Sequence, residues 1–366
     1  MGFKCGIVGL PNVGKSTLFN ALLSTIQAEA ANYPFCTIEP NVGRVNVPDA
    51  RLDKLAAIAG SAQLIPTQLE FVDIAGLVRG ASKGEGLGNQ FLAHIREVDA
   101  IIYMLRCFED GNITHVEGAI DPMRDSEIVE TELVLADLES LEKRLPALQK
   151  KAKTDKEAAE QVALIERILP VVSQGNPARE VELKDEEEKK QMKLLQLLTS
   201  KPVLYVCNVD EESAAGGNAQ SNKVMEMAAK KKAPCVVVSA RIEAEISMLA
   251  SDEDKKEFLS SLSLTETGLS RIIKAGYELL DLTTYFTVGP KEARAWTITR
   301  GTSAPAAAGV IHSDFEKGFI RAETISYNDY IAHNGESGAK EAGKFRLEGK
   351  EYRVKDGDVL HFRFNN

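Results

Sequence analysis

Apolar runs of five or six residues recur in the first third of the chain, and helical patterns separate them. Residues 3–8 and 100–105 are such stretches, typical of a buried strand, and residues 68–72, which read Gln-Leu-Glu-Phe-Val, also predict a strand. Apolar positions at helical spacing follow the first run at residues 18–23, and a second helical pattern covers residues 89–98. Strands that alternate with helices in this way predict an α/β fold with a mostly parallel sheet.

From residue 126 the pattern changes to long helices with a narrow apolar seam. Pro146 is expected to kink the first of these helices, and residues 185–198 predict a further helix. We therefore expect a helical insertion at residues 126–200, which serves either as an arm for a partner or as a structural lid. Spacings of three and four predict two antiparallel helices whose seam contains Val134, Leu138, Leu141, Leu145 and Leu148 on one helix and Val162, Ile165, Leu169 and Val172 on the other.

Two more apolar runs, at residues 202–207 and 234–238, resume the strand pattern, and a helix within residues 265–282 follows them. Short strand-like runs separated by glycine and proline turns then predict a small second domain. The expected organisation is the first part of an α/β domain at residues 1–125, the helical insertion at 126–200, the second part of the α/β domain at 201–282, and the small domain at 283–366.

The composition sets limits on location and partners. The 366 residues carry a net charge of −10, so a nucleic-acid contact has to use a local basic patch. The sequence contains no apolar run of 18 residues and no pattern of a secretion signal, so we expect no membrane span and a cytoplasmic protein. The scattered cysteines are expected to be reduced and mostly buried. They are Cys5, Cys36, Cys107, Cys207 and Cys235.

Residues 9–17 read Gly-Leu-Pro-Asn-Val-Gly-Lys-Ser-Thr and fit the P-loop pattern G-x-x-x-x-G-K-[ST]. A predicted strand precedes them and a predicted helix follows, which is the context that the motif requires. Glycines let the backbone approach an anion, and the N–H groups at the start of the helix surround phosphates. Lys15 would reach the β- and γ-phosphates, and the Ser16 hydroxyl would bind Mg²⁺. The predicted phosphate-binding residues are Asn12, Val13, Gly14, Lys15, Ser16 and Thr17.

Two later loops carry the residues expected to respond to the γ-phosphate. Thr37 lies in a proline-bounded segment after the first helix, where a threonine can close on Mg²⁺, although it can also be an ordinary loop residue. Asp73 ends a predicted strand in the sequence Asp-Ile-Ala-Gly, and its carboxylate is expected to hold Mg²⁺ through water. The N–H of Gly76 is expected to meet the γ-phosphate. Ser16, Thr37 and Asp73 are thus the predicted metal-binding residues.

The residue that orients the attacking water is less clear from the pattern. Ordinary switch GTPases place a glutamine two residues after D-x-x-G, roughly where Leu77 lies in this chain, and leucine cannot orient water. His115 in a later turn-rich loop is an alternative source of that function, although a lone loop histidine can simply be solvated. The predicted catalytic residues are His115, Lys15 and Gly76.

The base-binding sequence departs from the guanine pattern N-K-x-D. Residues 208–211 read Asn-Val-Asp-Glu, so valine replaces the lysine and the longer Glu211 replaces the aspartate that pairs with guanine. A misplaced carboxylate weakens guanine selection by several kcal/mol, whereas the Asn208 amide can pair with adenine N6 and N7. The predicted base-binding residues are Asn208, Val209, Glu211, Ser239 and Ala240.

The chain resembles the YchF/Obg-like ATPase family along its whole length. This resemblance implies a P-loop NTPase fold with a Ras-like G domain, a coiled-coil insertion and a small α+β, β-grasp-like TGS domain. It also implies hydrolysis of ATP, association with the ribosome and a loop histidine, here His115, in place of glutamine. The resemblance rests on residues 9–17, 32–41, 71–78, 80–92 and 208–211, and for the TGS domain on residues 299–302, 306–307 and 312–323.

The motifs predict a Mg²⁺-dependent ATPase, which we expect to be monomeric. The resemblance implies that it acts as a switch on the ribosome and contacts rRNA through the helical arm and the TGS domain. Two alternatives remain at this stage. One is a GTP-dependent switch, which competition between ATP and GTP distinguishes. The other is a ribosome or RNA adaptor whose nucleotide site is only structural, which would associate with ribosomes whatever the nucleotide. A small-molecule kinase is disfavoured because the C-terminal segment has no evident acceptor pocket or catalytic base.

Overall fold

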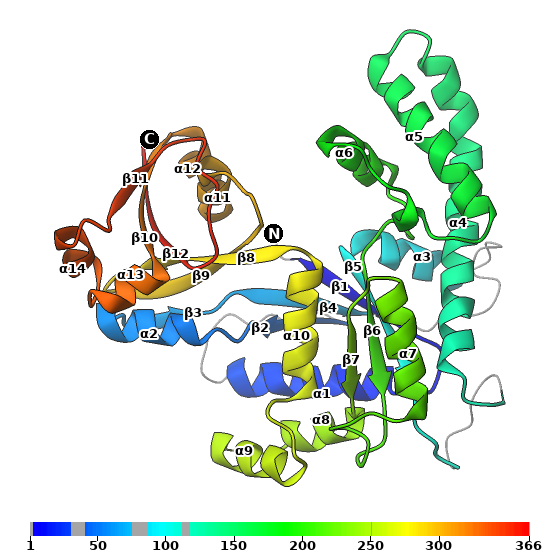
Figure 1. The fold of residues 1–366 in the computed structure, drawn as a ribbon, viewed down its shortest axis with the longest axis horizontal. Coiled ribbons are helices and arrows are strands. Elements are labelled where there is room, and N and C mark those ends of the chain that lie inside the picture. The colour runs from blue at the N-terminus through cyan, green and yellow to red at the C-terminus, as the bar shows by residue number, and fades with distance from the viewer. Residues whose placement is uncertain (1–2, 31–40, 75–86, 112–117, 250, 366) are drawn as a thin grey trace. The chain divides into compact units, whose positions relative to one another are not determined.

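The computed structural model describes residues 3–30, 41–74, 87–111, 118–249 and 251–365. Its contacts divide the chain into two compact units. Figure 1 shows the fold coloured by residue number. The larger unit comprises Phe3–Gly43 and Glu70–Gly276, and the smaller unit comprises Arg44–Leu69 and Tyr277–Asn366. Among the described residues, no helix is both long and apolar enough to cross a membrane.

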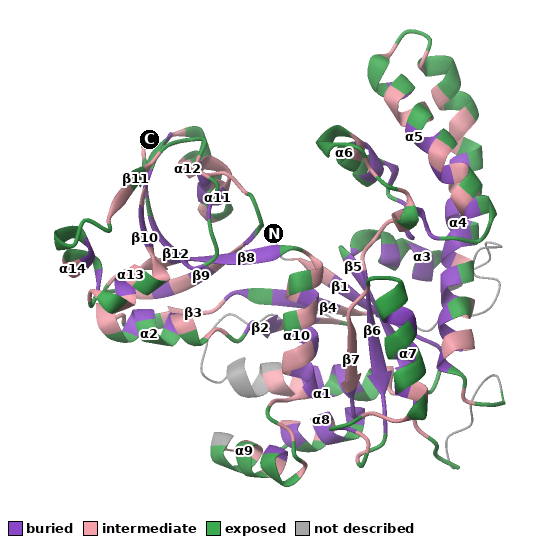
Figure 2. Cartoon of the chain, viewed as in Figure 1, coloured by how far each residue is buried: buried purple, intermediate pink, exposed green. Residues whose placement is uncertain are grey.

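The sheet of the larger unit is parallel at its centre. Its strand order is β2-β4-β1-β5-β6-β7, and β1 pairs in parallel with β4 and β5, β5 with β6, and β6 with β7. Every residue of β5 and β6 is buried, as expected for strands covered by helices on both faces (Figure 2). The α/β prediction is confirmed. The strands are β1 (Lys4–Val8), β2 (Val42–Asn46), β4 (Gln68–Asp73), β5 (Ala100–Arg106), β6 (Val203–Asn208) and β7 (Cys235–Val238).

Side-chain caps begin several of the helices around this sheet. Asn218 caps α7 with a reciprocal bond to Ser221, and Ser239 caps α8. The buried Glu243 carboxylate accepts hydrogen bonds from the N–H groups of Gly268 and Leu269 at the start of α10, at 2.6 and 3.1 Å. The helices are α1 (Lys15–Ala30), α3 (Leu87–Glu97), α7 (Ala219–Lys230), α8 (Ala240–Ser247), α9 (Asp252–Ser261) and α10 (Gly268–Leu279).

The helical insertion consists of α4 (Pro122–Lys151), α5 (Lys156–Ser173), a short 3₁₀ turn at Ala178–Glu180 and α6 (Glu186–Leu195). The predicted seam is confirmed apart from Val162, because its other members, among them Leu141 and Ile165, form one apolar cluster. α4 continues through Pro146, which lies inside it. Near the middle of α4, the buried Asp137 carboxylate accepts hydrogen bonds from both the N–H and the hydroxyl of Thr199 at 2.8 and 2.6 Å, which fixes the chain where it returns to the sheet.

The smaller unit has a mixed sheet of order β11-β10-β12-β8-β9-β3, in which β8 and β9 are antiparallel whereas β3 and β9 are parallel. An antiparallel pair also joins β10 to β12. Its elements are β3 (Gln63–Ile65), β8 (Leu282–Val288), β9 (Glu292–Thr299), β10 (Phe319–Ser326), β11 (Arg346–Glu348), β12 (Asp358–Phe364), α2 (Ala50–Ala59), α11 (Ala304–Ile311), α12 (Ser313–Lys317), α13 (Tyr327–Ala332) and α14 (Glu336–Glu341).

Residues 50–65, which form α2 and β3, pack with this C-terminal sheet, although the sequence pattern groups them with residues 1–125. Leu52 and Leu55 of α2 belong to one apolar cluster with Phe286 of β8, and β3 adds a strand beside β9. The Arg51 guanidinium reaches the Asp356 carboxylate at 2.6 Å. A linear division of the chain cannot reveal that this segment joins the C-terminal sheet, because the apolar face of α2 does not specify which sheet it covers.

Four of the five cysteines lie in the described residues, and all four are free thiols. Burial raises the pKa of Cys5 to about 12. A hydrogen bond with Cys107 is the first cause that raises the pKa of the Cys207 thiol, which lies 3.7 Å from the Cys235 sulfur. Thiols with raised pKa values are poor nucleophiles, which fits the predicted reduced state. Cys36 lies outside the described residues.

Candidate nucleotide-binding site

The glycine loop joins the end of β1 to the start of α1, as the motif predicts. A Cβ at Gly9 would lie 2.6 Å from the carbonyl oxygen of Met104. Gly14 has a φ of +93°, and a Cβ there would lie 2.2 Å from Nδ2 of Asn208. Both positions therefore require glycine, one for a close approach to β5 and the other for the left-handed backbone and the nearby amide.

Lys15 and Asp73 form an ion pair in this site. The Lys15 ammonium donates a hydrogen bond to Oδ1 of Asp73 at 2.7 Å, and the two side chains are only 11% and 16% exposed. Lys15 begins α1, whereas Asp73 is the last residue of β4. Because β1 and β4 are parallel neighbours, their carboxyl ends meet at one edge of the sheet. The pair thus brings the predicted phosphate cation next to the predicted metal-binding carboxylate.

Ser16 and Thr17 follow Lys15 in the exposed first turn of α1. The oxygen donors at this edge, the Ser16 hydroxyl and the Asp73 carboxylate, are of the hard type that Mg²⁺ prefers. No group of three or more histidine, cysteine or acidic side chains able to hold a metal occurs in the part of the chain that the structure describes. These donors fit a magnesium ion that takes most of its ligands from phosphate and water, as Mg²⁺ does in nucleotide sites.

Asn208 joins the glycine loop to the loop before α8. Its Nδ2 donates to the Val13 carbonyl at 2.9 Å, and its Oδ1 accepts from the Ala240 N–H at 2.9 Å. The residue is 4% exposed, and its backbone carbonyl accepts a bond from Cys107. The sequence pattern assigns this amide to adenine N6 and N7. In the structure, both polar atoms of the amide instead form hydrogen bonds with backbone groups of the protein. Here Asn208 positions the loops of the site.

The neighbouring base-motif residues divide into buried and exposed positions. Val209 is 2% exposed, and its N–H donates to the Val238 carbonyl. Ser239 and Ala240 are also buried, with the Ser239 hydroxyl at the start of α8. Glu211 is instead partly exposed and forms an ion pair with Arg241, whose Nε lies 2.7 Å from Oε1 of Glu211. The sequence patterns do not reveal this partner, because Glu211 and Arg241 lie 30 residues apart and belong to no shared motif.

Three predicted site residues, Thr37, Gly76 and His115, lie outside the described residues. The start of the loop that leads to His115 is described, and it is held by Arg106 at the end of β5. This guanidinium is 1% exposed, donates to the Phe108 carbonyl at 3.2 Å and stacks 4.6 Å from the centre of the Phe108 ring. Sequence reasoning missed Arg106; its only signal was a positive charge at the end of an apolar strand.

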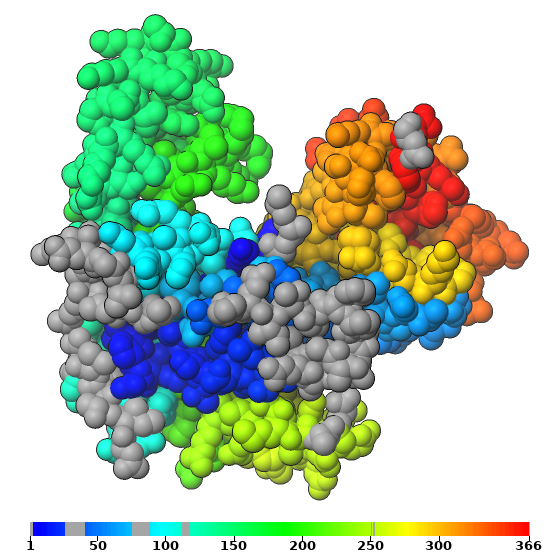
Figure 3. Space-filling view, turned by 180° about the vertical axis from the view of Figure 1, so that it is seen from behind, coloured from blue at the N-terminus to red at the C-terminus, as the bar shows by residue number. Residues whose placement is uncertain are grey.

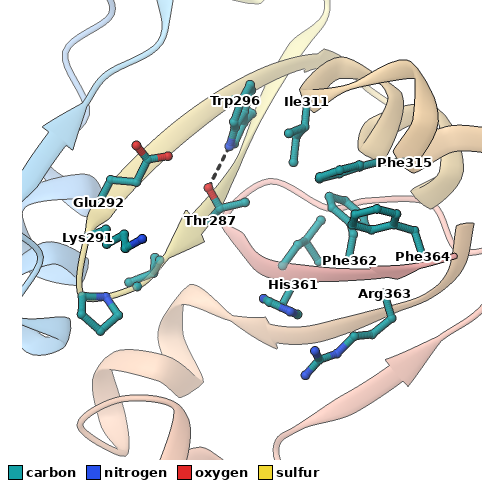
Figure 4. A pocket seen from close by; sticks show the side chains of 14 residues that line it. Thr287, Lys291, Glu292, Trp296, Ile311, Phe315, His361, Phe362, Arg363 and Phe364 are labelled. Carbon is teal, nitrogen blue, oxygen red and sulfur yellow. Dashed lines mark hydrogen bonds between the residues drawn. The ribbon is translucent and has the colours of Figure 1, made fainter. Parts of the chain in front are cut away.

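A cavity of about 720 Å³ lies in the smaller unit and contains none of the predicted site residues. Figure 4 shows its aromatic wall, where the Phe315 and Phe364 rings stack with centroids 3.9 Å apart. Nε1 of Trp296 donates to the Thr287 hydroxyl at 2.9 Å on the other side. Both stacked rings and Trp296 are partly exposed.

A glycine loop between the first strand and helix, its lysine, and a carboxylate at the end of the adjacent parallel strand define a P-loop nucleotide-binding domain. Comparisons with known proteins agree. A family model described as "50S ribosome-binding GTPase" matches residues 4–136, and the model YchF-GTPase_C, described as "Protein of unknown function (DUF933)", matches residues 282–365.

Full-length relatives make the assignment specific. The chain is 59% identical over 366 residues to the "Ribosome-binding ATPase YchF" of Haemophilus influenzae and 55% identical over 368 residues to the protein of that name from Bacillus subtilis, with all of each chain covered. A solved structure titled "Structure of the Schizosaccharomyces pombe YchF GTPase" has a TM-score of 0.88 and 39% identity, covering 99% of this chain and 98% of that one. The chain belongs to the YchF family.

Proposed function

We propose that this protein is a Mg²⁺-dependent ATPase that hydrolyses ATP slowly and acts as a nucleotide switch on the ribosome. The Lys15–Asp73 ion pair carries the proposal, because its two charges are those that a phosphate and a metal would engage. The bacterial relatives named as ribosome-binding ATPases support the nucleotide and the partner. We further propose that the protein acts in the cytoplasm as a monomer.

The ion pair suggests how binding proceeds. A triphosphate competes with Asp73 for the Lys15 ammonium, since both are anions that accept its hydrogen bonds. Asp73 is then released to face the metal, and the loop N–H groups from Val13 to Thr17 surround the phosphates. Mg²⁺, when bound by Ser16, Thr37 and, through water, Asp73, would neutralise phosphate charge. Catalysis in this scheme is mainly positioning and charge stabilisation.

The γ-phosphate and the attacking water are assigned to residues outside the described ranges. Gly76 is proposed to donate its N–H to the γ-phosphate, and His115 to orient the water in place of the missing glutamine. A His115→Ala variant should then lose turnover while its affinity for ATP stays close to that of the parent. Unchanged turnover would remove His115 from the mechanism, and a matched His333→Ala variant in the smaller unit controls for loss of a histidine.

Adenine is the proposed base. The names of the relatives differ on this point, since the bacterial proteins are called ATPases and the fission-yeast protein a GTPase. Glu211 is one methylene longer than the aspartate that pairs with guanine, and Arg241 engages its carboxylate. Both features weaken a guanine site. Equilibrium competition of ATP and GTP tests the assignment, and a GTP advantage of about tenfold or more would overturn it.

The ribosomal partner is proposed to be rRNA, contacted by the helical insertion and by the C-terminal domain, which we propose to be a TGS domain. Sedimentation with ribosomes in ATP, ADP or no nucleotide tests the switch. We expect association to change with the nucleotide and the change to disappear in a Lys15→Ala protein. Equal association in all three conditions, with Lys15→Ala behaving as the parent, would instead favour an adaptor with a structural nucleotide site.

A further inference from the structure

The charge of the helical insertion is strongly polarised along its length. Residues 143–156 contain six basic side chains and one acidic side chain, a net charge of +5. The remaining residues of the 126–200 segment contain six basic and fifteen acidic side chains, a net charge of −9. We call residues 143–156 the insertion tip. Its basic residues are Lys143, Arg144, Lys150, Lys151, Lys153 and Lys156.

The insertion tip is the part of α4 and α5 that packs least. Buried residues of α4 occur from Pro122 to Leu141, whereas none is buried from Glu142 to the end of the helix. Figure 1 draws the α4–α5 connection at the end of the hairpin opposite the sheet, and Figure 3 shows the insertion, in green, standing out from the rest of its unit. A molecule outside the protein can therefore reach the tip.

Two tip lysines retain an uncompensated charge. Lys150 and Lys153 are exposed and have no ion-pair partner among the described residues. Lys151 pairs with Asp155 at 2.9 Å across the turn, and Asp155 also caps α5 through the N–H groups of Glu157 and Ala158. This pair and cap order the backbone that carries the two free ammonium groups, which reduces the conformational entropy lost when they bind an anion.

We propose that the insertion tip binds the phosphate backbone of RNA, with Lys150 and Lys153 as its principal contacts. The inference deepens the proposed function, since it rests on association with the ribosome and names the surface and chemistry of contact. Phosphate is the ligand that fits because the chain as a whole is acidic, so a polyanion has to approach through a local basic patch. Lysines supply charge without base-specific geometry, so the contact positions the protein and reads no sequence.

The spacing of the charges also suits a repeated anion. Lys143 and Lys150 are seven residues apart on α4, so they share a face and lie about 10 Å apart along the axis. The Lys143 ammonium pairs with the Glu139 carboxylate at 2.5 Å, and this exposed pair has to open before Lys143 binds a phosphate. Lys153 continues the series into the turn. Each ammonium that neutralises a phosphate releases counterions. A plot of the logarithm of the binding constant against the logarithm of the salt concentration should therefore steepen by about 0.7–0.9 for each contact. The difference in this slope between the parent and a tip variant thus measures how many phosphate contacts the tip makes.

The test compares the full-length protein with a Lys150→Gln/Lys153→Gln variant in titrations of purified ribosomes at several KCl concentrations. We expect the variant to bind about tenfold or more weakly at low salt and to lose about 1–2 units of salt slope. A Lys150→Arg/Lys153→Arg variant should keep both values. A Lys223→Gln/Lys230→Gln variant on α7 is the matched control, because it removes two exposed lysines elsewhere in the same unit.

Parent-like affinity and slope in the tip variant, or an equal loss in the α7 control, would overturn the inference while the parent still binds. Failure of the parent itself to bind ribosomes would instead overturn the proposed function. The same titrations with protein-free rRNA identify the ligand. A loss that persists supports phosphate, whereas a loss seen only with intact ribosomes means that acidic ribosomal protein is the partner and the inference is wrong.

Discussion

Lys15 at the start of α1 and Asp73 at the end of β4 are joined by a 2.7 Å hydrogen-bonded ion pair, although 58 residues separate them in the chain. In a site proposed to hold a triphosphate with Mg²⁺, Lys15 would bind phosphate and Asp73 would bind the metal through water. The pair is thus both a structural contact and a competitor of the nucleotide, and this competition can be measured.

An Asp73→Asn substitution should separate the two roles. Without Mg²⁺, ATP affinity should rise by about a few-fold, because the Lys15 ammonium no longer has to give up its hydrogen bond to the Asp73 carboxylate when it binds phosphate. With Mg²⁺, hydrolysis should fall by about tenfold or more. Calorimetric titration and single-turnover hydrolysis measure these effects. Glu97→Gln, an exposed acid at the end of α3, is the control, and weaker ATP binding by Asp73→Asn without the metal would contradict competition.

Gly14→Ala should be costly for two reasons that a second glycine separates. Gly14 combines a φ of +93° with an amide 2.2 Å from the added Cβ, whereas Gly60, at the end of α2, has a φ of +63° and open space around it. We expect Gly60→Ala to lower the free energy of unfolding by about 1 kcal/mol through backbone strain alone. Gly14→Ala should lower it further and also abolish nucleotide binding. Denaturant unfolding and nucleotide titration test this, and equal losses in both proteins would contradict the steric argument.

Asn208→Ala should destabilise the protein and weaken nucleotide binding together. The substitution leaves the Val13 carbonyl and the Ala240 N–H buried without their partner, which costs about 2–4 kcal/mol of folding free energy. The glycine loop then loses its link to the α8 loop. Asn218→Ala is the comparison, because that amide holds Cys107 and the start of α7 but not the glycine loop. It should lower stability while leaving ATP affinity nearly unchanged; a matching loss of affinity would show that general destabilisation explains both.

Arg241→Ala should change nucleotide choice more than stability. The Glu211–Arg241 pair is exposed, so its loss should alter the free energy of unfolding by less than about 0.5 kcal/mol. The carboxylate freed by the substitution can accept hydrogen bonds from guanine, so the preference for ATP over GTP should fall by a few-fold. Competition binding measures the ratio. Glu245→Gln also removes a neighbour of Arg241 but leaves Glu211 engaged, and it should keep the parent preference.

The sequence predicted those features that depend on neighbouring residues. The strands β5 and β6, the helical seam around Leu141 and Ile165, and the glycine loop all follow from local periodicity or spacing. Features that depend on partners distant in the chain were missed. The packing of α2 against β8 and β9, the bonds of Asn208 and the partner of Glu211 each join segments whose pairing no local pattern specifies.

The candidate site contains both residues that the sequence places together and a residue that the sequence does not reveal. Lys15 and Asp73 could be placed together from sequence, because a parallel sheet brings the ends of β1 and β4 to one edge. Arg106 could not, because its charge at the end of a buried strand has no motif, and its role depends on the carbonyl of Phe108 and the ring above it. Thr37, Gly76 and His115 lie outside the described residues and stay predictions.

Hydrolysis of ATP by a Lys15→Ala protein is the most direct test of the account. Single-turnover release of phosphate in Mg²⁺ should proceed in the parent and fall by about 10²-fold or more in Lys15→Ala, because a charge-assisted contact to the transferring phosphate is lost. Lys4→Ala, which removes a partly exposed lysine of β1 outside the glycine loop, should behave as the parent. Parent-level hydrolysis by Lys15→Ala would contradict the central claim that this lysine serves the triphosphate.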